Sequence, residues 1–316
     1  MRHFLGLFFL ATVFIGCSGP KMKGVSPYRV AYNVFVPDST KDNYEVFAME
    51  TDGSNRQNLT RNTDVAWTYY AFGKRLFFIS DREECRRCYY LHEMTSDGRN
   101  VRKVSDLRLE DSWMSSRNAG KEMVVSGRIG REIRFQLFLI NTETGTFRQI
   151  TTDTTAMYRD PAFSPDGKHL VFAYKKNRRD RNAHEELYIM RDDGSDFRQL
   201  TTYPEGDPDR KTYGYKAGPP RWHPTEGFIS YHSKQSGKNS LFAVMPDGKK
   251  HWKLTSYAGI EGWHDWSQDG KWLVFDTSDA KETQYHIAIM NWKTKEVRQL
   301  TSTDYKTQLS PVFVVK

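Results

Sequence analysis

The residues of this 316-residue chain that could do chemistry are few, and the clearest pair is a Cys-x-x-Cys motif. Cys85 and Cys88 could form a local disulfide, a redox centre or half of a zinc site. A redox motif usually begins a helix of a βαβ unit, whereas the residues around this motif have the pattern of strands. A zinc site needs two further ligands, and His92 is the only close histidine. A disulfide is favoured if the chain is exported to an oxidising compartment.

Motifs that identify common enzyme classes are absent from the sequence. There is no Gly-x-Ser-x-Gly, no His-Glu-x-x-His, no P-loop and no dinucleotide-binding glycine pattern. The run from His184 to Tyr188 begins like a zinc-protease motif, but Tyr188 stands where the second histidine belongs. We therefore assign no catalytic residue from these motifs.

The N-terminal residues have the pattern of an export signal. A basic start is followed by mostly apolar residues 4–15, which as a helix rise only about 18 Å, too little for a bilayer core of roughly 30 Å. The next residues, Phe14-Ile15-Gly16-Cys17, are similar to the lipobox of bacterial lipoproteins, with Phe where Leu is usual. The alternative is an ordinary signal peptide with a chance cysteine. The resemblance implies that residues 1–16 are removed, that Cys17 is lipidated and that residues 17–27 form a tether.

Export affects two further predictions. Ser18 after the cysteine favours, by analogy with lipoprotein sorting, the outer membrane, where we expect the protein to face the periplasm. An oxidising compartment favours the disulfide between Cys85 and Cys88.

The elements that must position any site come from an internal repeat. Six windows share an apolar strand, a tight turn that often carries Asp-Gly, and a short polar strand ending in an aliphatic residue and Thr or Ser: residues 46–60, 91–105, 137–151, 187–201, 241–255 and 287–301. A second hairpin lies between windows, most clearly at 160–172 and 263–275. Four strands a repeat predict an all-β fold, a six-bladed β-propeller of four-stranded blades. A β-sandwich, the alternative, does not explain six registers of one pattern.

The two ends of the chain predict how the ring closes. A strand-like segment at 28–36 precedes the first window without a first strand of its own, and 307–315 follows the last window with the pattern of such a strand. We expect the C-terminal strand to complete the first blade, three strands plus one. The propeller domain is then predicted to span 28–316.

The repeat resembles a known family. Ser-Pro-Asp-Gly-Lys at 164–168, together with the Asp-Gly-Ser and Leu-Thr endings, is similar to the WD40-like (PD40) repeats of the TolB family propeller. The resemblance covers roughly 28–316 and implies the fold more than the function, because the same blades occur in TolB, in peptidase propellers and in pectin-degrading lyases. TolB itself has an α/β domain before its propeller, and the pattern of that domain is missing here, so we expect a TolB-like protein other than TolB.

Loop lengths predict which face of the propeller carries a site. Connections between the fourth and first strands and between the second and third strands share one face, here called the long-loop face, and the other turns share the short-turn face. All the long connections, 81–88, 175–186 and 202–217, belong to the long-loop face. Such elaboration is typical of a binding face, although neutral loop growth is the alternative.

The residues of this face have the composition of an interface. Tyr with Arg is typical of protein interfaces and of sugar-stacking surfaces, and the 202–217 loop contains both types. The first strands are expected to bring further polar and aromatic residues to the same face. We predict a partner-binding face formed by Arg210, Tyr213, Tyr215, Asp160, Trp263 and His264.

A metal site is the alternative that the family resemblance implies. Lyases with this type of propeller hold a metal with channel histidines, so His232, His264 and Asp265 could form a His/His/carboxylate site of a metal-assisted uronic-acid lyase. We otherwise predict no cofactor.

Composition limits the remaining function classes. The chain has 47 Lys and Arg against 39 Asp and Glu, a formal charge of +8, and the polar composition excludes a polytopic membrane protein. Most of the excess lies in the last strand of each repeat, where Lys and Arg prevent edge-to-edge pairing. We expect a monomeric lipoprotein that binds an envelope protein or a glycan, contacts the membrane through its lipid and binds no nucleic acid.

Overall fold

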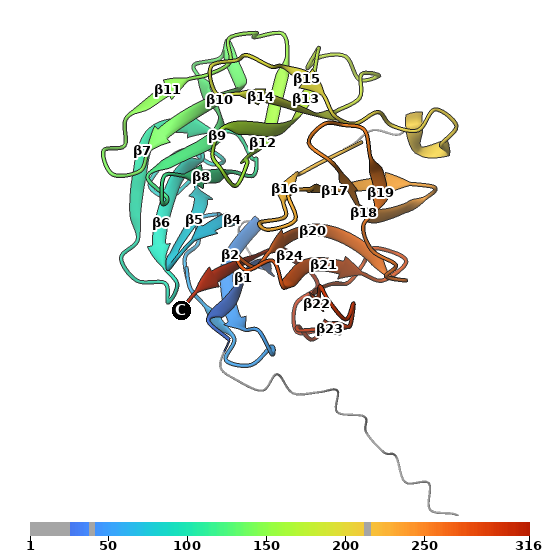
Figure 1. Cartoon of the computed structure of the whole chain (residues 1–316). Helices are drawn as coiled ribbons and strands as arrows, with labels where there is room; N and C mark the ends of the chain where they lie inside the picture. Colours follow the sequence, from blue (N-terminus) through green and yellow to red (C-terminus); the bar gives the residue numbers. More distant parts are fainter. Residues whose placement is uncertain (1–25, 38–41, 212–215) are drawn as a thin grey trace, which may run out of the picture.

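The computed structural model describes residues 26–37, 42–211 and 216–316, and Figure 1 shows their strands arranged around a central axis. Four of the sheets have four strands each. They consist of β24 (Gln308–Val315), β1 (Tyr28–Pro37), β2 (Asp42–Glu50) and β3 (Gln57–Asn58); of β12 (Met157–Phe163), β13 (His169–Lys175), β14 (Glu186–Arg191) and β15 (Arg198–Gln199); of β16 (Arg221–Trp222), β17 (Ile229–Gln235), β18 (Lys238–Val244) and β19 (His251–Lys253); and of β20 (Ile260–Trp266), β21 (Trp272–Ser278), β22 (Tyr285–Asn291) and β23 (Val297–Gln299).

The remaining sheet has eight strands. It contains β4 (Ala66–Phe72), β5 (Arg75–Ser80), β6 (Tyr90–Thr95), β7 (Arg102–Leu109), β8 (Ser115–Arg117), β9 (Glu122–Ile129), β10 (Ile133–Asn141) and β11 (Phe147–Gln149). A 3-10 helix, η1 (Pro208–Lys211), lies in the long connection after β15.

The eight-stranded sheet corrects the prediction of separate four-stranded blades throughout. The second and third repeats are joined because β7 is eight residues long, whereas the last strands of the other repeats have two or three, and it pairs with β9. The contact is close, since a Cβ on Gly127 of β9 would lie 3.2 Å from the carbonyl oxygen of Arg108. A residue without a side chain therefore allows the long strand to approach β9.

The C-terminal strand completes the first sheet, as the sequence predicts. β24 pairs antiparallel with β1, and Tyr28 lies opposite Val315. The backbone N–H of Lys316 donates to the carbonyl oxygen of Pro27 (3.0 Å). The ring of strands thus closes by hydrogen bonds between the two ends of the described chain.

The glycine turns and the Thr endings of the repeat have separate physical roles. The terminal Thr closes the outer hairpin, as where the N–H of Leu187 donates to Thr201 Oγ1 at 2.9 Å. The turn glycine has a left-handed conformation, as at Gly145 with φ of 76°. A Cβ there would lie 2.6 Å from the carbonyl oxygen of Val104 in the preceding repeat. Glycine is therefore required both by the turn and by the contact between repeats.

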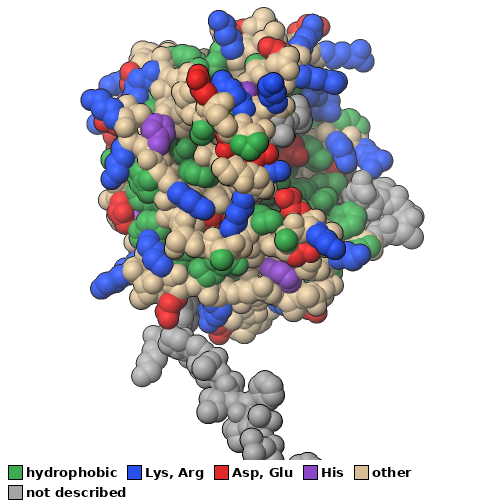
Figure 2. Space-filling model, turned by 90° about the vertical axis from the view of Figure 1, so that its right-hand side faces the viewer, with side chains coloured by type: hydrophobic (Ala, Val, Ile, Leu, Met, Phe, Trp, Pro, Cys, Tyr) green, Lys and Arg blue, Asp and Glu red, His purple; other side chains and the backbone are tan. Residues whose placement is uncertain are grey.

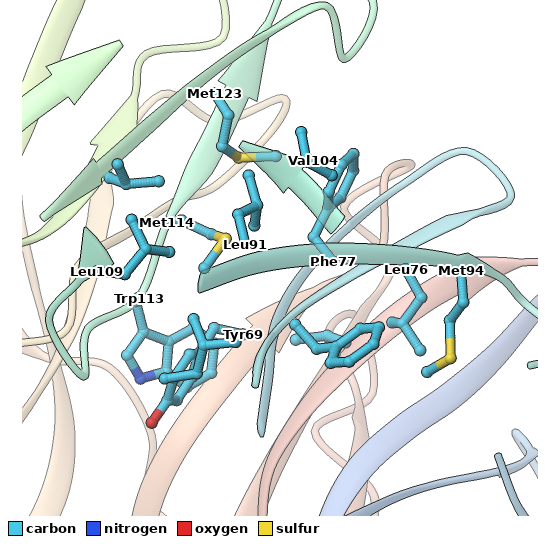
Figure 3. Close-up of a cluster of buried hydrophobic side chains, with 14 of the residues drawn as sticks. Tyr69, Leu76, Phe77, Leu91, Met94, Val104, Leu109, Trp113, Met114 and Met123 are labelled. Atoms are coloured by element: carbon cyan, nitrogen blue, oxygen red, sulfur yellow. The ribbon is translucent and has the colours of Figure 1, made fainter. Parts of the chain in front are cut away.

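Hydrophobic clusters fill the spaces between neighbouring sheets. The largest joins the first sheet to the eight-stranded sheet, and Figure 3 shows part of it, with Tyr69 beside Trp113. Similar clusters join β13 and β14 to β17, and β18 to β21 and β22. Bulky side chains between sheets stabilise the ring as a whole.

Arginines of the outer strands also join neighbouring repeats. Arg102 Nη2 donates to the carbonyl oxygen of Thr142 (2.8 Å), and Arg298 Nη2 donates to that of Thr51 (2.7 Å). Figure 2 shows Lys and Arg side chains scattered among Asp and Glu over the side of the molecule that it displays. The outer cations are thus dispersed, and two of them bind the turn of the next repeat in addition to covering an edge.

Within the described ranges, no helix has the length and apolar character needed to cross a membrane.

Candidate functional site

The residues predicted for the partner-binding face do not form one surface. Asp160 and His264 are fully buried, with 0% of their surface exposed, and cannot touch a partner. Trp263 is half-buried and its ring lies edge-on to that of Trp67, with centroids 6.4 Å apart. Arg210 lines a hollow of about 670 Å³ and Trp263 lines a smaller one of about 190 Å³, while Tyr213 and Tyr215, like Cys17, fall outside the described residues.

The burial of Asp160 has a local cause. Asp160 lies at a β-bulge of β12, between Arg159 and Ala162, and its φ is 53°. The bulge turns the carboxylate toward the preceding repeat, where Oδ1 accepts the N–H of Trp113 at 2.8 Å. The side chain therefore joins two repeats.

A hollow on the long-loop face is here called the loop hollow. Its volume is about 670 Å³, and its walls come from the connection between β13 and β14 and from the connection after β15, which contains η1. Its charged lining residues are Lys175, Arg181, His184, Glu185, Glu186, Arg210, Lys211 and Lys216. The two longest connections of the chain therefore meet at one repeat.

Electrostatics give the loop hollow a positive character. Five Lys or Arg residues line it against two Glu. Glu186 is committed to the fold, because it accepts hydrogen bonds from Thr201 Oγ1 (2.7 Å) and from the N–H of Tyr203 (2.7 Å). Burial raises the pKa of Glu186 to about 7. Near neutral pH this carboxyl offsets the cations only in part.

The other polar groups of the loop hollow are positioned by short contacts. Lys216 Nζ donates to the carbonyl oxygen of Asp209 (2.5 Å) and lies 4.8 Å from the centre of the Tyr203 ring. His184 Nε2 is 3.0 Å from the carbonyl oxygen of Arg210. These contacts order the wall, and the hollow can offer cations and hydrogen-bond donors to a polar or acidic group.

A second hollow, here called the channel mouth, lies on the short-turn face at the centre of the ring. Its volume is about 490 Å³. Its walls include one residue from each innermost strand, Tyr70, Ser116, Phe163, Trp222, Trp266 and Phe313. Sequence reasoning missed this hollow, because each strand contributes only its last residues and no long loop marks the place.

Arg221 reaches from the channel mouth across the centre of the ring. Its guanidinium carbon lies 3.8 Å from the centre of the Trp113 ring, and Nη2 donates to the carbonyl oxygen of Tyr69 at 3.2 Å. Tyr69 and Trp113 also pack together, with ring centroids 5.2 Å apart (Figure 3). Burial lowers the pKa of Arg221 to about 10. The indole of Trp113 and the backbone of Tyr69, both on the far side of the ring of sheets, therefore hold the guanidinium in place.

The three residues predicted as metal ligands are not brought together as a site. Adjacent residues of a strand point to opposite sides, so His264 and Asp265 of β20 cannot both face one ion. His264 Nε2 is 2.7 Å from Ser230 Oγ, whereas Asp265 Oδ1 is 3.7 Å from Arg221 Nε. In the part of the chain that the structure describes, no three His, Cys, Asp or Glu side chains could hold a metal ion. This corrects the expectation of a metal site formed by His232, His264 and Asp265.

Burial also determines the protonation of these residues. It lowers the pKa of His232 to about 4 and raises that of Asp265 to about 6. It holds the pKa of His264 well below its usual value, helped by the positive charge of Arg221. Both histidines are therefore neutral at neutral pH.

The cysteine pair lies in the connection between β5 and β6. A disulfide joins Cys85 and Cys88, whose Cα atoms are 5.2 Å apart. The N–H of Cys88 also donates to the carbonyl oxygen of Cys85 at 2.8 Å. The disulfide closes a single turn of a connection on the long-loop face.

Comparison with known proteins identifies the type of fold. The family described as "TolB beta propeller domain" matches residues 65–313. TolB from Acinetobacter baumannii has 15% sequence identity, with a TM-score of 0.67 over 92% of this chain and 67% of that one. Oligogalacturonate lyase from Vibrio parahaemolyticus has 15% identity and a TM-score of 0.54, over 83% of this chain and 72% of that one. At such identities the likeness shows the fold alone.

A curated relative shares part of the sequence. Dipeptidyl-peptidase 5 of Porphyromonas endodontalis is 31% identical over 121 residues. The match covers 38% of this chain and only 16% of the peptidase. The shared stretch is thus a small part of that enzyme.

Proposed function

The chain belongs to the TolB β-propeller domain family, and we propose that it acts as a binding scaffold of the bacterial cell envelope. In this role the ring of sheets is a rigid support, and the loop hollow captures a protein partner. The loop hollow supports this function best, because the longest connections build it and its cations exceed its acids. The partner that fits is a protein segment that presents acidic side chains.

The ring of this scaffold has six blades in our proposal. We count the eight-stranded sheet as two blades, β4–β7 and β8–β11. Only two residue pairs join β7 to β9, whereas seven pairs join β9 to β10 within one blade. Each blade then contributes one strand to the channel mouth.

The position of the first strand supports a defined orientation on the membrane. Tyr28 lies opposite Val315, whose N–H donates to the carbonyl oxygen of Gly73 in the turn between β4 and β5 (2.9 Å). The described chain therefore begins at the short-turn face. A tether of residues 17–27 reaches at most about 35 Å. A lipid on Cys17 would keep the short-turn face toward the outer membrane and the long-loop face toward the periplasm.

The anchor is tested by Cys17→Ala, which removes the thiol that would be acylated. We expect the variant to appear in the soluble fraction of cell envelopes, while the unmodified chain sediments with membranes. Continued sedimentation of the variant with membranes would show that the lipid proposal is wrong.

The binding role is tested by reversing charge at the rim of the loop hollow. Arg181 and Lys211 are exposed there, so Arg181→Glu with Lys211→Glu removes cations without opening the core. The control is Lys249→Glu with Lys250→Glu, which makes the same charge change in the exposed turn between β18 and β19. We expect the first variant to recover at least about tenfold less of one cross-linked envelope protein, identified by mass spectrometry, a loss of roughly 1.4 kcal/mol. Equal recovery with both variants would contradict the proposed function.

Metal-assisted lyase activity is not part of the proposal. The likeness to oligogalacturonate lyase concerns the fold, and His264 and Asp265 point to opposite sides of β20.

A further inference from the structure

The channel mouth is lined by two residues whose N–H donors have no hydrogen-bond acceptor within the described ranges. Nε of Arg221 and Nε1 of Trp222 are both buried, and neither has a hydrogen-bond partner among the described residues. Arg221 is only 6% exposed, and both residues line the channel mouth. A buried N–H without an acceptor is unfavourable, so an oxygen atom that reached these groups from the mouth would be stabilising.

One acceptor lies near Arg221, beyond hydrogen-bond distance. The Asp265 side chain is 22% exposed, and its Oδ1 lies 3.7 Å from Arg221 Nε. Its other oxygen, Oδ2, accepts the N–H of Phe313 at 2.9 Å. A ligand beside Arg221 therefore meets one donor and one acceptor close together, as a group that both donates and accepts requires.

The walls of the channel mouth are aromatic. Tyr70, Phe72 and Trp222 are half-buried there and leave part of each ring accessible. The phenol of Tyr70 is fixed by a 2.9 Å hydrogen bond to Ser116 Oγ. Fixed aromatic rings beside a few polar groups suit a flat ligand with apolar faces and a polar edge.

The charge of the channel mouth excludes a strongly charged ligand. Two arginines, Arg117 and Arg221, are balanced by Asp166 and Asp265. Arg117 is already paired, with Glu122 and with Asp192, each at 2.7 Å. The loop hollow differs, because there the cations exceed the acids.

We propose that the channel mouth is a second binding site, which takes a neutral pyranose unit of a glycan. The hydroxyls of a pyranose both donate and accept, so one of them can serve Arg221 Nε and Asp265, and another oxygen of the glycan can accept from Trp222 Nε1. Its C–H faces can pack on the rings of Tyr70 and Trp222. A hollow of about 490 Å³ lies within the usual size of small-ligand sites. This site does not depend on a partner at the loop hollow.

The same sugar could come from a free oligosaccharide or from the head group of a glycolipid. Titration of the full mature chain with cellobiose, maltose and N,N′-diacetylchitobiose, followed by tryptophan fluorescence and calorimetry, tests the first source. Phosphatidylcholine vesicles with and without a neutral galactolipid test the second. A dimer of galacturonate and an acidic peptide serve as charged probes.

The decisive variant is Trp222→Phe, which retains an aromatic ring but removes the N–H donor together with the five-membered part of the indole. We expect it to bind the neutral sugar about three- to tenfold more weakly, as the loss of one hydrogen bond implies. Trp252→Phe in β19, away from the channel mouth, is the matched control and should leave the affinity unchanged. Gln268→Ala removes an exposed amide at the rim and should weaken binding without affecting the fold. Thermal unfolding of each variant shows that the fold is retained.

The outcomes separate the sources and the alternatives. Saturable binding of a free sugar that Trp222→Phe weakens supports an oligosaccharide, and galactolipid-dependent vesicle binding with the same sensitivity supports a head group. The proposal would be overturned if only the charged probes bound, or if no neutral sugar gave saturable binding. It would also be overturned if vesicle binding did not depend on the galactolipid, or if Trp222→Phe and Trp252→Phe had equal effects. None of these results changes the expected capture of a protein at the loop hollow.

Discussion

The loop hollow and the channel mouth are built in opposite ways from the same repeat. One repeat, β12 to β15, forms the loop hollow by extending two of its connections. The channel mouth instead takes one or a few residues from each of the innermost strands β4, β8, β12, β16, β20 and β24. A site built by lengthening loops can be recognised in the sequence from the loop lengths. A site to which every repeat contributes a few strand residues has no such signal, because each contribution has the sequence of an ordinary strand end.

The two sites also differ in whether the residues that line them also stabilise the fold. Arg181 and Lys211 at the loop hollow are exposed, so their replacement should leave the fold intact. Arg221 at the channel mouth is buried and also contacts Trp113 and Tyr69 across the ring. A change at the channel mouth therefore affects the contacts between repeats, whereas a change at the rim of the loop hollow affects a ligand.

The largest expected effect on stability comes from replacing Arg221 at the channel mouth. Arg221→Met keeps much of the side-chain volume but leaves the partly buried carboxylate of Asp265 without its counter-ion and removes the hydrogen bond to Tyr69. We expect the free energy of unfolding to fall by roughly 3–5 kcal/mol, as for other buried pairs that lose one partner. Urea unfolding followed by tryptophan fluorescence measures this change.

The control for Arg221→Met is Arg181→Met at the loop hollow, which should stay within about 0.5 kcal/mol of the unmodified protein. Similar losses in both variants would mean that the two sites do not differ in their structural role.

The pH dependence of stability sharpens the comparison. Burial raises the pKa of Glu186 at the loop hollow from 4.5 to about 7, and that of Asp265 at the channel mouth from 3.8 to about 6. Because folding raises each pKa, the contribution to stability is complete below the unfolded-state value and is lost as pH rises through the folded-state value. The loss should extend from about pH 4.5 to about pH 7 for Glu186 and from about pH 4 to about pH 6 for Asp265.

Variants without the titrating group reveal these two windows. Relative to Glu186→Gln, the unmodified protein should lose roughly 1–3 kcal/mol of unfolding free energy between pH 4.5 and pH 7, at about 1.4 kcal/mol for each unit of pKa shift. Relative to Asp265→Asn the loss should be complete about one pH unit earlier. Urea unfolding at intervals between pH 4 and pH 8 gives both differences. A gain of stability with rising pH, or a single common window, would contradict the assignments.

Much of the fold could be predicted because the repeat encodes local interactions. A turn such as that at Gly145 needs a left-handed residue, and a closing Thr such as Thr201 needs its partner strand beside it. Both requirements are met within one hairpin, so the same residue types recur at matching positions of the repeats. The joining of two repeats through β7 and Gly127 depends on one long strand and could not be read from the shared pattern.

The candidate site was predicted less completely, for two different reasons. Asp160 is buried because a β-bulge turns it toward Trp113, and a bulge depends on pairing between strands that sequence does not specify. The metal site could have been excluded from the sequence itself, since the alternation of side chains along a strand separates His264 from Asp265. Arg210 lies at a hollow because loop length, not strand register, determines its position, and its role in binding a partner stays a prediction.

The smallest expected effect on stability completes the comparison. Lys211→Ala at the loop hollow and Gln268→Ala at the channel mouth both truncate exposed side chains, so each should change the free energy of unfolding by less than about 0.5 kcal/mol. Their effects on binding should differ. Lys211→Ala should weaken capture of the acidic protein partner and leave binding of the neutral sugar unchanged. Gln268→Ala should weaken binding of the neutral sugar and leave capture of the partner unchanged. Parallel measurements of partner capture and sugar titration on both variants test this. A variant that weakened both ligands would show that the two sites are coupled through the ring, for which the exposed position of either side chain provides no physical path.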